Sequence, residues 1–420
     1  MTARLLRTLL PAGLVVAWAL VIWRVLGGPP GFIDLTVYRA GGYAWVHGIP
    51  LYGPQFPALI ELLPLPFTYP PISAVLFASL AAVPFSLAAV LLAAASLAGL
   101  VFVGWLTAWR LEPDRWRVIQ LTGAAVVLGT LTEPVRETLT FGQVNLLLMA
   151  LVAADCLLPR TPWPRGALIG LAAAIKLTPA MFVLFFVAHR QWRPVFAAGA
   201  AFAVVTAVGF LAAPGPSVQY WFGGVLTDPS RIGSPGFPSN QSLAGLLHRW
   251  ELPAAWQIGS WLLGALATVA AGWVAVRRLR ADGHDVAALL AVATTGLLAS
   301  PVSWSHHYVW AVPALIWFAH WAGRSWRRWA GVAVLAGVFV VGPHWLVATR
   351  EDHMPHWGIG AQIVGNAYVW VAVVALLAAA AAGLARRPTR SAAGEDPGHP
   401  SRRGGQQQPA RSGEQPSHPG

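Results

Sequence analysis

Residues 31–40 read Gly31-Phe32-Ile33-Asp34-Leu35-Thr36-Val37-Tyr38-Arg39-Ala40, and they follow an apolar run that ends near Leu26. A carboxylate at this place lies at the membrane–water boundary, where a charge is costly and is usually kept for a function. A companion segment, Leu65-Pro66-Phe67-Thr68-Tyr69-Pro70-Pro71, carries two consecutive prolines, which stop a helix and fix an extended turn. We therefore expect the chain to leave the membrane, present Asp34, Tyr38 and Arg39, and re-enter through this bend.

The composition is that of an integral membrane protein. Hydrophobic residues make up 56% of the 420 residues and charged residues only 10%, whereas a soluble protein has about 25% charged residues. The apolar runs are continuous rather than alternating, which indicates helices and not a β-barrel. The net charge of +12 does not point to nucleic acid, because the arginines cluster at the ends of apolar runs and act as topology signals. The single cysteine, Cys156, excludes an intramolecular disulfide and argues against a cysteine metal site.

Hydropathy predicts a series of membrane-spanning helices. The first resembles a signal peptide, but it lacks a convincing cleavage site, so we expect it to be retained. Residues 72–82 are too short to span and predict a re-entrant or interfacial helix. The predicted spans are Leu9–Leu26, Phe85–Trp109, Val118–Thr132, Val144–Leu158, Ala167–Ala188, Val195–Ala213, Trp256–Val276, Ala287–Ala299, Tyr308–Trp321, Trp329–Val347 and Ile363–Leu384.

The arginine clusters all fall on one side of the membrane only if Ala167–Ala188 crosses twice. This run contains Lys176-Leu177-Thr178-Pro179, and Lys176 is the only lysine of the chain. A break there gives two half-helices, which a membrane tolerates only where they line a cavity. The result is an all-α bundle of about twelve crossings with both termini cytoplasmic. We expect a membrane domain at 1–385, a disordered cytoplasmic tail at 386–420, and the working site on the arginine-poor, extracytoplasmic face.

Several polar residues interrupt the apolar sequence before residue 180, and each has a functional and a structural interpretation. Asp34 is a candidate general base or the N-cap of a helix beginning near Leu35. Gln143 and Asn145, at the head of an apolar helix, bind a sugar hydroxyl or cap locally. Arg136 holds a phosphate or pairs with a glutamate of its own loop. Lys176 meets an anion inside the membrane or snorkels to the interface.

Two more polar clusters follow in the second half of the chain. Asn240 and Gln241 suit carbohydrate binding, or they belong to a turn with an N-cap at Ser239 or Asn240. Residues 300–308 carry Trp304 and the adjacent His306 and His307, which suit contact with phosphate or sugar. A metal site is less favoured, because neighbouring histidines do not share a helix face and no H-x-x-x-H or H-E-x-x-H motif is present.

Nucleotide-driven chemistry is not indicated. The sequence has no Walker A motif, no glycine-rich phosphate loop followed by a helix, and no G-x-S-x-G nucleophile motif.

These motifs resemble glycosyltransferase family 87, the bacterial polyprenyl-phosphate-mannose-dependent α-1,2-mannosyltransferases. The match covers most of 31–308 and thins beyond His356. Each motif is short, but together and in this order they are specific. They are Asp34-Leu35-Thr36-Val37-Tyr38, Gly48-Ile49-Pro50-Leu51-Tyr52, Phe67-Thr68-Tyr69-Pro70-Pro71, Gly142-Gln143-Val144-Asn145, Ile175-Lys176-Leu177-Thr178-Pro179, Asn240-Gln241-Ser242-Leu243 and Ser300-Pro301 followed by Trp304-Ser305-His306-His307.

The resemblance implies a GT-C type fold and an inverting transfer at the extracytoplasmic face of the plasma membrane. Mannose would pass from polyprenyl-phosphate-mannose to a mannose-containing glycolipid or lipoglycan, with Asp34 as the base. No cofactor and no metal would be required. We expect Lys176, His306, His307 and Arg136 at the donor phosphate. Contacts with sugar or acceptor are expected from Tyr38, Arg39, Tyr69, Gln143, Asn145, Asn240, Gln241 and Trp304.

Three alternatives remain open at this point. In the first, the enzyme transfers a sugar other than mannose, such as arabinose or glucose, from the same lipid carrier. The protein is a transporter or flippase of a lipid-linked sugar, which predicts inverted repeats and polar residues near the midplane. The third is a non-catalytic partner in cell-wall assembly, in which the motif residues are structural.

Overall fold

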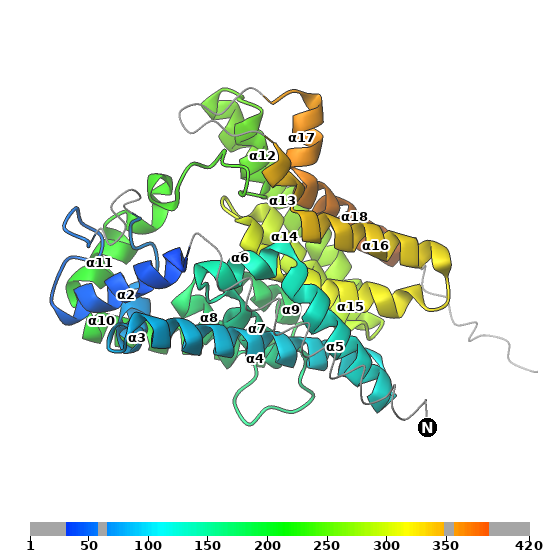
Figure 1. The fold of residues 1–420 in the computed structure, drawn as a ribbon, viewed down its shortest axis with the longest axis horizontal. Helices are drawn as coiled ribbons and strands as arrows, with labels where there is room; N and C mark the ends of the chain where they lie inside the picture. Colours follow the sequence, from blue (N-terminus) through cyan, green and yellow to red (C-terminus); the bar gives the residue numbers. More distant parts are fainter. Residues whose placement is uncertain (1–30, 58–64, 348–356, 386–420) are drawn as a thin grey trace, which may run out of the picture. The chain divides into compact units, whose positions relative to one another are not determined.

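The computed structural model describes residues 31–57, 65–347 and 357–385, drawn in colour in Figure 1. These residues form helices and a single isolated β-bridge, between Asn240 and Trp304. The all-helical fold class is therefore confirmed for the described part of the chain. The expected first span at 9–26 and the tail at 386–420 lie outside the described residues.

The described part of the chain begins with a short helix, and a connection that contains residues 65–70 follows it. The elements that follow alternate long apolar helices with short helical turns (Figure 1). In order they are α2 (Ile33–Val46), α3 (Pro71–Ala81), α4 (Phe85–Leu111), α5 (Arg115–Leu131), α6 (Glu133–Phe141), α7 (Asn145–Leu157), α8 (Ala167–Ile175), η1 (Thr178–Val183), α9 (Leu184–Val187), α10 (Trp192–Ala212), α11 (Pro214–Phe222), η2 (Val225–Thr227), η3 (Pro229–Ile232), α12 (Leu243–Arg249), α13 (Ala254–Ala281), α14 (Asp285–Ala299), η4 (Ser305–Trp310), α15 (Ala311–Ala322), α16 (Trp326–Val341), η5 (Pro343–Leu346), α17 (Ile359–Gly365) and α18 (Ala367–Ala385).

The number of membrane crossings expected from hydropathy is not confirmed. Among the described residues, α4, α10 and α13 are long and apolar enough to cross, and two bent pairs, α5 with α6 and α17 with α18, raise the total to five. Other expected spans form shorter helices, such as the 13-residue α7 and the 15-residue α14. At 1.5 Å per residue these reach only about 20 Å, less than the hydrocarbon core of about 30 Å.

The bend between α5 and α6 measures 69°. Thr132 has extended backbone angles there (φ −67°, ψ 141°), and Pro134 occupies the first turn of α6, where its missing N–H costs nothing. The helix expected to end at Thr132 thus continues, after the bend, into α6.

The predicted break at Lys176 is confirmed. α8 ends at Ile175, Lys176 is extended (φ −148°, ψ 124°), and a 3₁₀ turn resumes at Thr178. The hydroxyl of Ser73 donates to the Ile175 carbonyl at 2.7 Å, which satisfies an acceptor that the broken helix leaves free.

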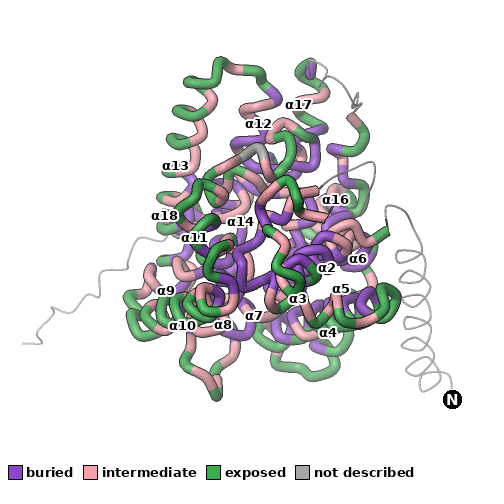
Figure 2. Tube along the Cα trace, turned by 90° about the vertical axis from the view of Figure 1, so that its left-hand side faces the viewer, coloured by how far each residue is buried: buried purple, intermediate pink, exposed green. Residues whose placement is uncertain are grey.

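The core lies where the short helices meet, and the two long helices α10 and α13 lie at its periphery. The apolar windows of α10 and α13 are only 11% and 17% buried, against 50% for α4, so α10 and α13 face outward. Figure 2 shows the same contrast, with buried stretches concentrated in α2, α6, α7 and α14 and exposed stretches along α10 and α13. The short helices α2 and α3 pack closely, because Gly42 of α2 meets the backbone of Ala78.

We predict that Gly42→Ala destabilises the protein. A Cβ at Gly42 would lie 2.6 Å from the Ala78 nitrogen and 2.7 Å from its Cα, and backbone atoms cannot move away as a side chain can. Such overpacking costs about 1–3 kcal/mol, so the thermal midpoint of the purified protein in detergent should fall. Gly331→Ala, inside α16, is the control, because a Cβ there meets nothing within 4 Å and alanine favours a helix. An equal midpoint for both variants would contradict this account of α2–α3 packing.

Candidate active site

Asp34 lies in the first turn of α2, outside the candidate spans. It is not the N-cap, because α2 begins at Ile33 and Phe32 occupies the cap position. The start of α2 is fixed to the end of α6 by a 2.7 Å hydrogen bond from the Phe32 nitrogen to the Thr140 carbonyl. Gly142 permits this approach, because its φ is +71° and a Cβ there would lie 2.9 Å from the Leu35 Cβ.

Gln143 connects Asp34 with two tyrosines. Its side-chain oxygen accepts from the Tyr38 hydroxyl at 2.8 Å and from the Tyr69 hydroxyl at 3.2 Å, and the two hydroxyls are themselves 2.8 Å apart. Since the amide oxygen is used by the tyrosines, the amide nitrogen is the group that donates to Asp34. Residues from three segments expected to meet at the site are thus brought together.

The surroundings of Asp34 favour a carboxyl group that changes its charge near neutral pH. Burial raises the pKa of Asp34 to about 6, while the hydrogen bond from Gln143 and the positive charge of Lys176 act in the opposite direction. A base with a pKa near the working pH is suited to accept a proton during a reaction.

Lys176 reaches the same place from the break after α8. Its ammonium donates to the side-chain oxygen of Asn145 and to Nε2 of His307, both at 3.1 Å. Nζ also lies 5.6 Å from the centre of the Tyr69 ring. The ammonium is therefore held by neutral groups, with Asp34 as its charged neighbour.

The two adjacent histidines are neutral in this arrangement. An ammonium can only donate, so Nε2 of His307 is an acceptor and its proton resides on Nδ1. Burial, with Lys176 adding to the effect, lowers the pKa of His307 well below its usual value and that of His306 to about 3. Contact of His306 and His307 with a phosphate stays a prediction, and in it the two imidazoles would be neutral. They remain available as neutral hydrogen-bonding groups.

His306 has an unusual environment. Both of its ring nitrogens are buried without a hydrogen-bond partner among the described residues, and its ring lies edge-on to Phe141 at 5.5 Å. Its carbonyl accepts from Thr138 at 3.1 Å and from the amide of Asn145 at 3.0 Å. The side-chain oxygen of Asn145 also accepts from Lys176, so both polar atoms of its amide are hydrogen-bonded. Asn145 therefore connects the turn that contains His306 with the helix break at Lys176.

Both arginines expected at the site, Arg39 and Arg136, lie apart from this cluster. Arg39 donates to the carbonyls of Leu80 and Val83, the latter at 2.7 Å, and its guanidinium lies 5.6 Å from the Phe85 ring. It closes the turn between α3 and α4. Arg136 makes a long hydrogen bond of 3.5 Å to the Leu131 carbonyl, and no described contact joins it to the cluster.

Asn240 and Gln241 are fully buried, and backbone groups use their amides. Asn240 accepts from the Ser303 nitrogen at 3.0 Å, while Gln241 donates to the carbonyls of Pro238 and Gly365, both at 2.7 Å. The N-cap of the following helix is Ser242, not Ser239 or Asn240. The structure thus gives this pair no free group for a sugar. It instead fixes the loop that carries Trp304, which is itself half-buried.

Glu133 is a structural residue that the sequence did not reveal. Its carboxylate is fully buried and accepts from Ser305 at 2.6 Å, from Trp345 Nε1 at 3.0 Å and from the Tyr368 hydroxyl at 3.0 Å. His344 Nε2 lies 3.4 Å away. Glu133 therefore anchors the first residue of η4, the turn that carries His306 and His307. The only signal in the sequence was a carboxylate between apolar runs, which are poor in carboxylates. The hydrogen-bond partners of Glu133 come from distant parts of the chain.

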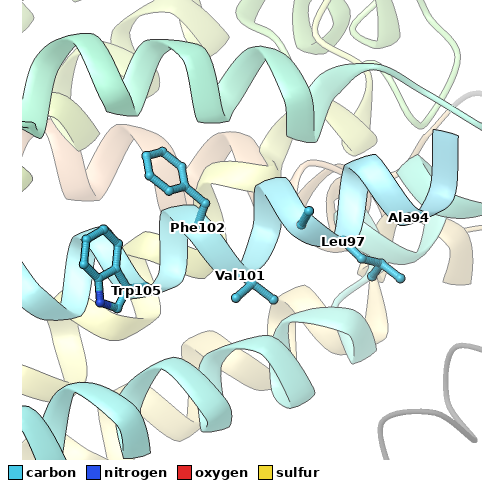
Figure 3. A pocket seen from close by; sticks show the side chains of 6 residues that line it. Ala94, Leu97, Val101, Phe102 and Trp105 are labelled. Carbon is cyan, nitrogen blue, oxygen red and sulfur yellow. The ribbon is translucent and has the colours of Figure 1, made fainter. Parts of the chain in front are cut away.

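A groove on the outer side of α4 is a separate feature. It encloses about 600 Å³, and Figure 3 shows its side chains along one helix. It has no hydroxyl, amide or charge that could orient a sugar, so it is not the reaction site. It is lined by Ala94, Leu97, Ala98, Val101, Phe102 and Trp105.

Within the described residues, no three histidine, cysteine, aspartate or glutamate side chains gather in a way that could hold a metal ion. The cluster instead combines a carboxyl group, that of Asp34, with one half-buried ammonium, that of Lys176.

Comparisons with known proteins identify the family of this chain. A model described as glycosyltransferase family 87 matches residues 67–301. The chain is 38% identical over 395 residues to the polyprenol-phosphate-mannose-dependent alpha-(1-2)-phosphatidylinositol mannoside mannosyltransferase of Mycobacterium tuberculosis, which covers 90% of this chain and 91% of that protein. It is 34% identical over 352 residues to a phosphatidylinositol pentamannoside mannosyltransferase of Mycolicibacterium smegmatis. That match covers 83% of this chain and 82% of that protein.

A more distant relative is an alpha-(1->3)-arabinofuranosyltransferase of Corynebacterium glutamicum, 27% identical over 338 residues, with 77% of this chain and 75% of that protein covered. No solved structure matches the chain. The family model and the relatives that span most of its length show that this chain belongs to glycosyltransferase family 87.

Proposed function

We propose that this chain is an inverting mannosyltransferase that uses polyprenol-phosphate-mannose and extends a phosphatidylinositol mannoside through an α-1,2 linkage. The observation that carries the proposal is the Asp34 carboxyl, which is hydrogen-bonded to Gln143 and lies within the electrostatic influence of the Lys176 ammonium. The named activities of the relatives supply the donor and the acceptor class. Membership of a glycosyltransferase family favours this function over a transporter or a scaffold.

The reaction follows from the positions of the two charges. Asp34 takes the proton of an acceptor hydroxyl while that oxygen bonds to the anomeric carbon of the mannose. The bond from this carbon to the phosphate oxygen breaks, and polyprenyl phosphate leaves with an additional negative charge. A single displacement converts a β-linked donor into an α-linked product. Lys176 stabilises the charge that develops on the phosphate, and its hydrogen bonds to Asn145 and His307 hold it in position.

The remaining site residues have supporting roles in this proposal. Tyr38 and Tyr69 orient Gln143 through its side-chain oxygen, and the exposed part of Trp304 offers an aromatic face to a sugar. His306 supplies unpaired ring nitrogens to a bound substrate.

The arrangement of arginines supports a site on the extracytoplasmic side of the plasma membrane. Arg110 and Arg280 meet Asp285, at the start of α14, at 2.9 Å and 3.2 Å. α14 is 15 residues long, about 22 Å, and its other end leads into η4 with His307. The basic cluster and the site therefore lie at opposite ends of α14. Arginines mark the cytoplasmic side of a membrane protein.

Asp34→Asn should abolish transfer of mannose to a phosphatidylinositol mannoside by membranes that contain equal amounts of protein. Loss of a general base lowers the rate by about 10²–10⁴-fold. The thermal midpoint should not fall, because burial already disfavours the charged carboxylate. Asp114→Asn is the matched control, since asparagine caps a helix as well as aspartate does. Equal transfer by Asp34→Asn and wild type would remove Asp34 as the base, and wild-type transfer only from polyprenyl-phosphate-arabinose would change the donor.

The pH dependence of kcat/KM should show an acid limb with a midpoint near 6, because the base works only when it is ionised. Lys176→Met removes a positive charge that lowers the pKa of Asp34, so the limb should move to higher pH, in addition to a lower maximal rate. Lys176→Arg, which keeps the charge, should leave the limb close to that of the wild type. Identical limbs for Lys176→Met and the wild type would show that Asp34 and Lys176 do not interact.

Gln241→Leu should destabilise the protein without changing the KM for the acceptor. It leaves two carbonyls unpaired in a buried place, and each such group costs about 1–3 kcal/mol. A lower thermal midpoint with an unchanged KM is expected. An unchanged midpoint with a raised acceptor KM would restore Gln241 as a sugar-binding residue.

A further inference from the structure

Arg231 is a cation that the reaction as derived does not use. It lies in η3 and is half-buried. Its Nη1 and Nη2 make long hydrogen bonds of 3.3 Å to the carbonyls of Tyr52 and Phe67. Its Nε is buried without a partner in the described part of the chain. The ion pairs found among the described residues do not include Arg231.

An aromatic wall connects Arg231 with the active site. The guanidinium lies 5.7 Å from the centre of the Tyr52 ring, and the Tyr52 hydroxyl donates to the Tyr69 carbonyl at 2.7 Å. The Phe67 ring lies between them, 6.1 Å from Tyr52 and 6.0 Å from Tyr69. Lys176 stands over the Tyr69 end of this wall at 5.6 Å. Phe67 contacts Arg231 and Tyr69 contacts Lys176. These two residues are at most about 7 Å apart along the chain.

The other side of the Arg231 loop faces the histidine turn. Gly233 has a φ of +94°, and a Cβ there would lie 3.5 Å from the Trp304 ring, so this loop packs on the residue that precedes η4. The loop of Arg231 and Gly233 therefore contacts two segments: Arg231 contacts the one that contains Tyr52 and Phe67, and Gly233 contacts Trp304, which precedes the turn with His307. Both segments belong to the proposed site.

The chemistry of this position favours an anion. Within the described parts of the chain, the half-buried guanidinium contacts two carbonyls and the Tyr52 ring, all of them neutral. It has therefore lost part of its hydration to groups that carry no negative charge. Its two long hydrogen bonds leave one further N–H on each terminal nitrogen, the fork that matches two oxygens of a phosphate. The reaction proposed above uses two lipid substrates, each with a phosphodiester, whereas Lys176 stands beside the base and serves only one of them.

We infer that Arg231 binds the phosphodiester of a lipid substrate, at a second phosphate site separate from that of Lys176. This inference rests on the proposed function. Since Lys176 acts on the donor phosphate, the acceptor lipid is the substrate that places its phosphate at Arg231. Its mannose is then directed along the aromatic wall towards Asp34, which takes the proton of the acceptor hydroxyl.

The test compares Arg231→Gln with the wild type, as full-length proteins in nanodiscs, on two acceptors: a phosphatidylinositol mannoside and an alkyl mannoside without phosphate. The KM for the phosphatidylinositol mannoside should rise about tenfold or more, as expected for the loss of hydrogen bonds to a charged group. The kcat/KM for the alkyl mannoside and the KM for the donor should not change. Arg231→Lys should restore part of the affinity. Arg327→Gln is the matched control, because Arg327 also stacks on an aromatic ring at 5.7 Å, that of Trp326.

The other outcomes of this comparison decide which lipid phosphodiester, if any, binds Arg231. A rise confined to the donor KM would keep a lipid phosphodiester at Arg231 and identify it as that of the donor. Equal losses on both acceptors, or no change on either, would overturn the inference and leave Arg231 as a tie between loops. If the wild type transfers mannose to neither acceptor, the proposed function fails. Retention of a short-chain phosphatidylinositol mannoside in native mass spectrometry then tests Arg231 alone: weaker retention by Arg231→Gln supports the site, and equal retention overturns it.

Discussion

The arrangement of this protein depends on one half-buried ammonium. Lys176 is the only lysine of the chain, and it lies where an apolar helix is broken. A charge in such surroundings must find partners, and here they come from distant parts of the chain: Asn145 from α7, His307 from η4, and the ring of Tyr69 from the first connection. Asp34, the proposed base, completes the group. One interaction thus joins the segments that make the site.

A buried carboxylate complements this ammonium on the opposite flank of η4. Ser305 donates to Glu133, whereas His307, two residues later, accepts from Lys176. The turn is therefore held between a negative and a positive charge, and the carbonyl of His306 between them is bonded to Thr138 and Asn145. This restraint explains how a short 3₁₀ turn, which has few hydrogen bonds of its own, can hold two histidines in fixed positions.

Several residues of the candidate site could be predicted to lie together, because each of them carries a local signal. Asp34, Gln143 and Lys176 are polar residues in apolar sequence, and such residues are kept for function or for a buried partner. The break at Lys176 followed from the proline and from the distribution of arginines. Asn240 and Gln241 gave the same kind of signal, but an amide that binds a sugar and an amide that binds a backbone carbonyl look alike in a sequence.

The sequence by itself determined the helical membrane character, the break at Lys176 and the family-like set of polar residues, because hydropathy and helix-breaking residues act over a few neighbours. The tertiary structure decided which polar groups are already bonded: the neutral state of His307, the structural role of Gln241, and the network around Glu133. It also showed that several apolar runs form helices too short to cross a membrane. These properties depend on partners tens to hundreds of residues away, such as Tyr368 for Glu133, and a local pattern carries no information about such partners.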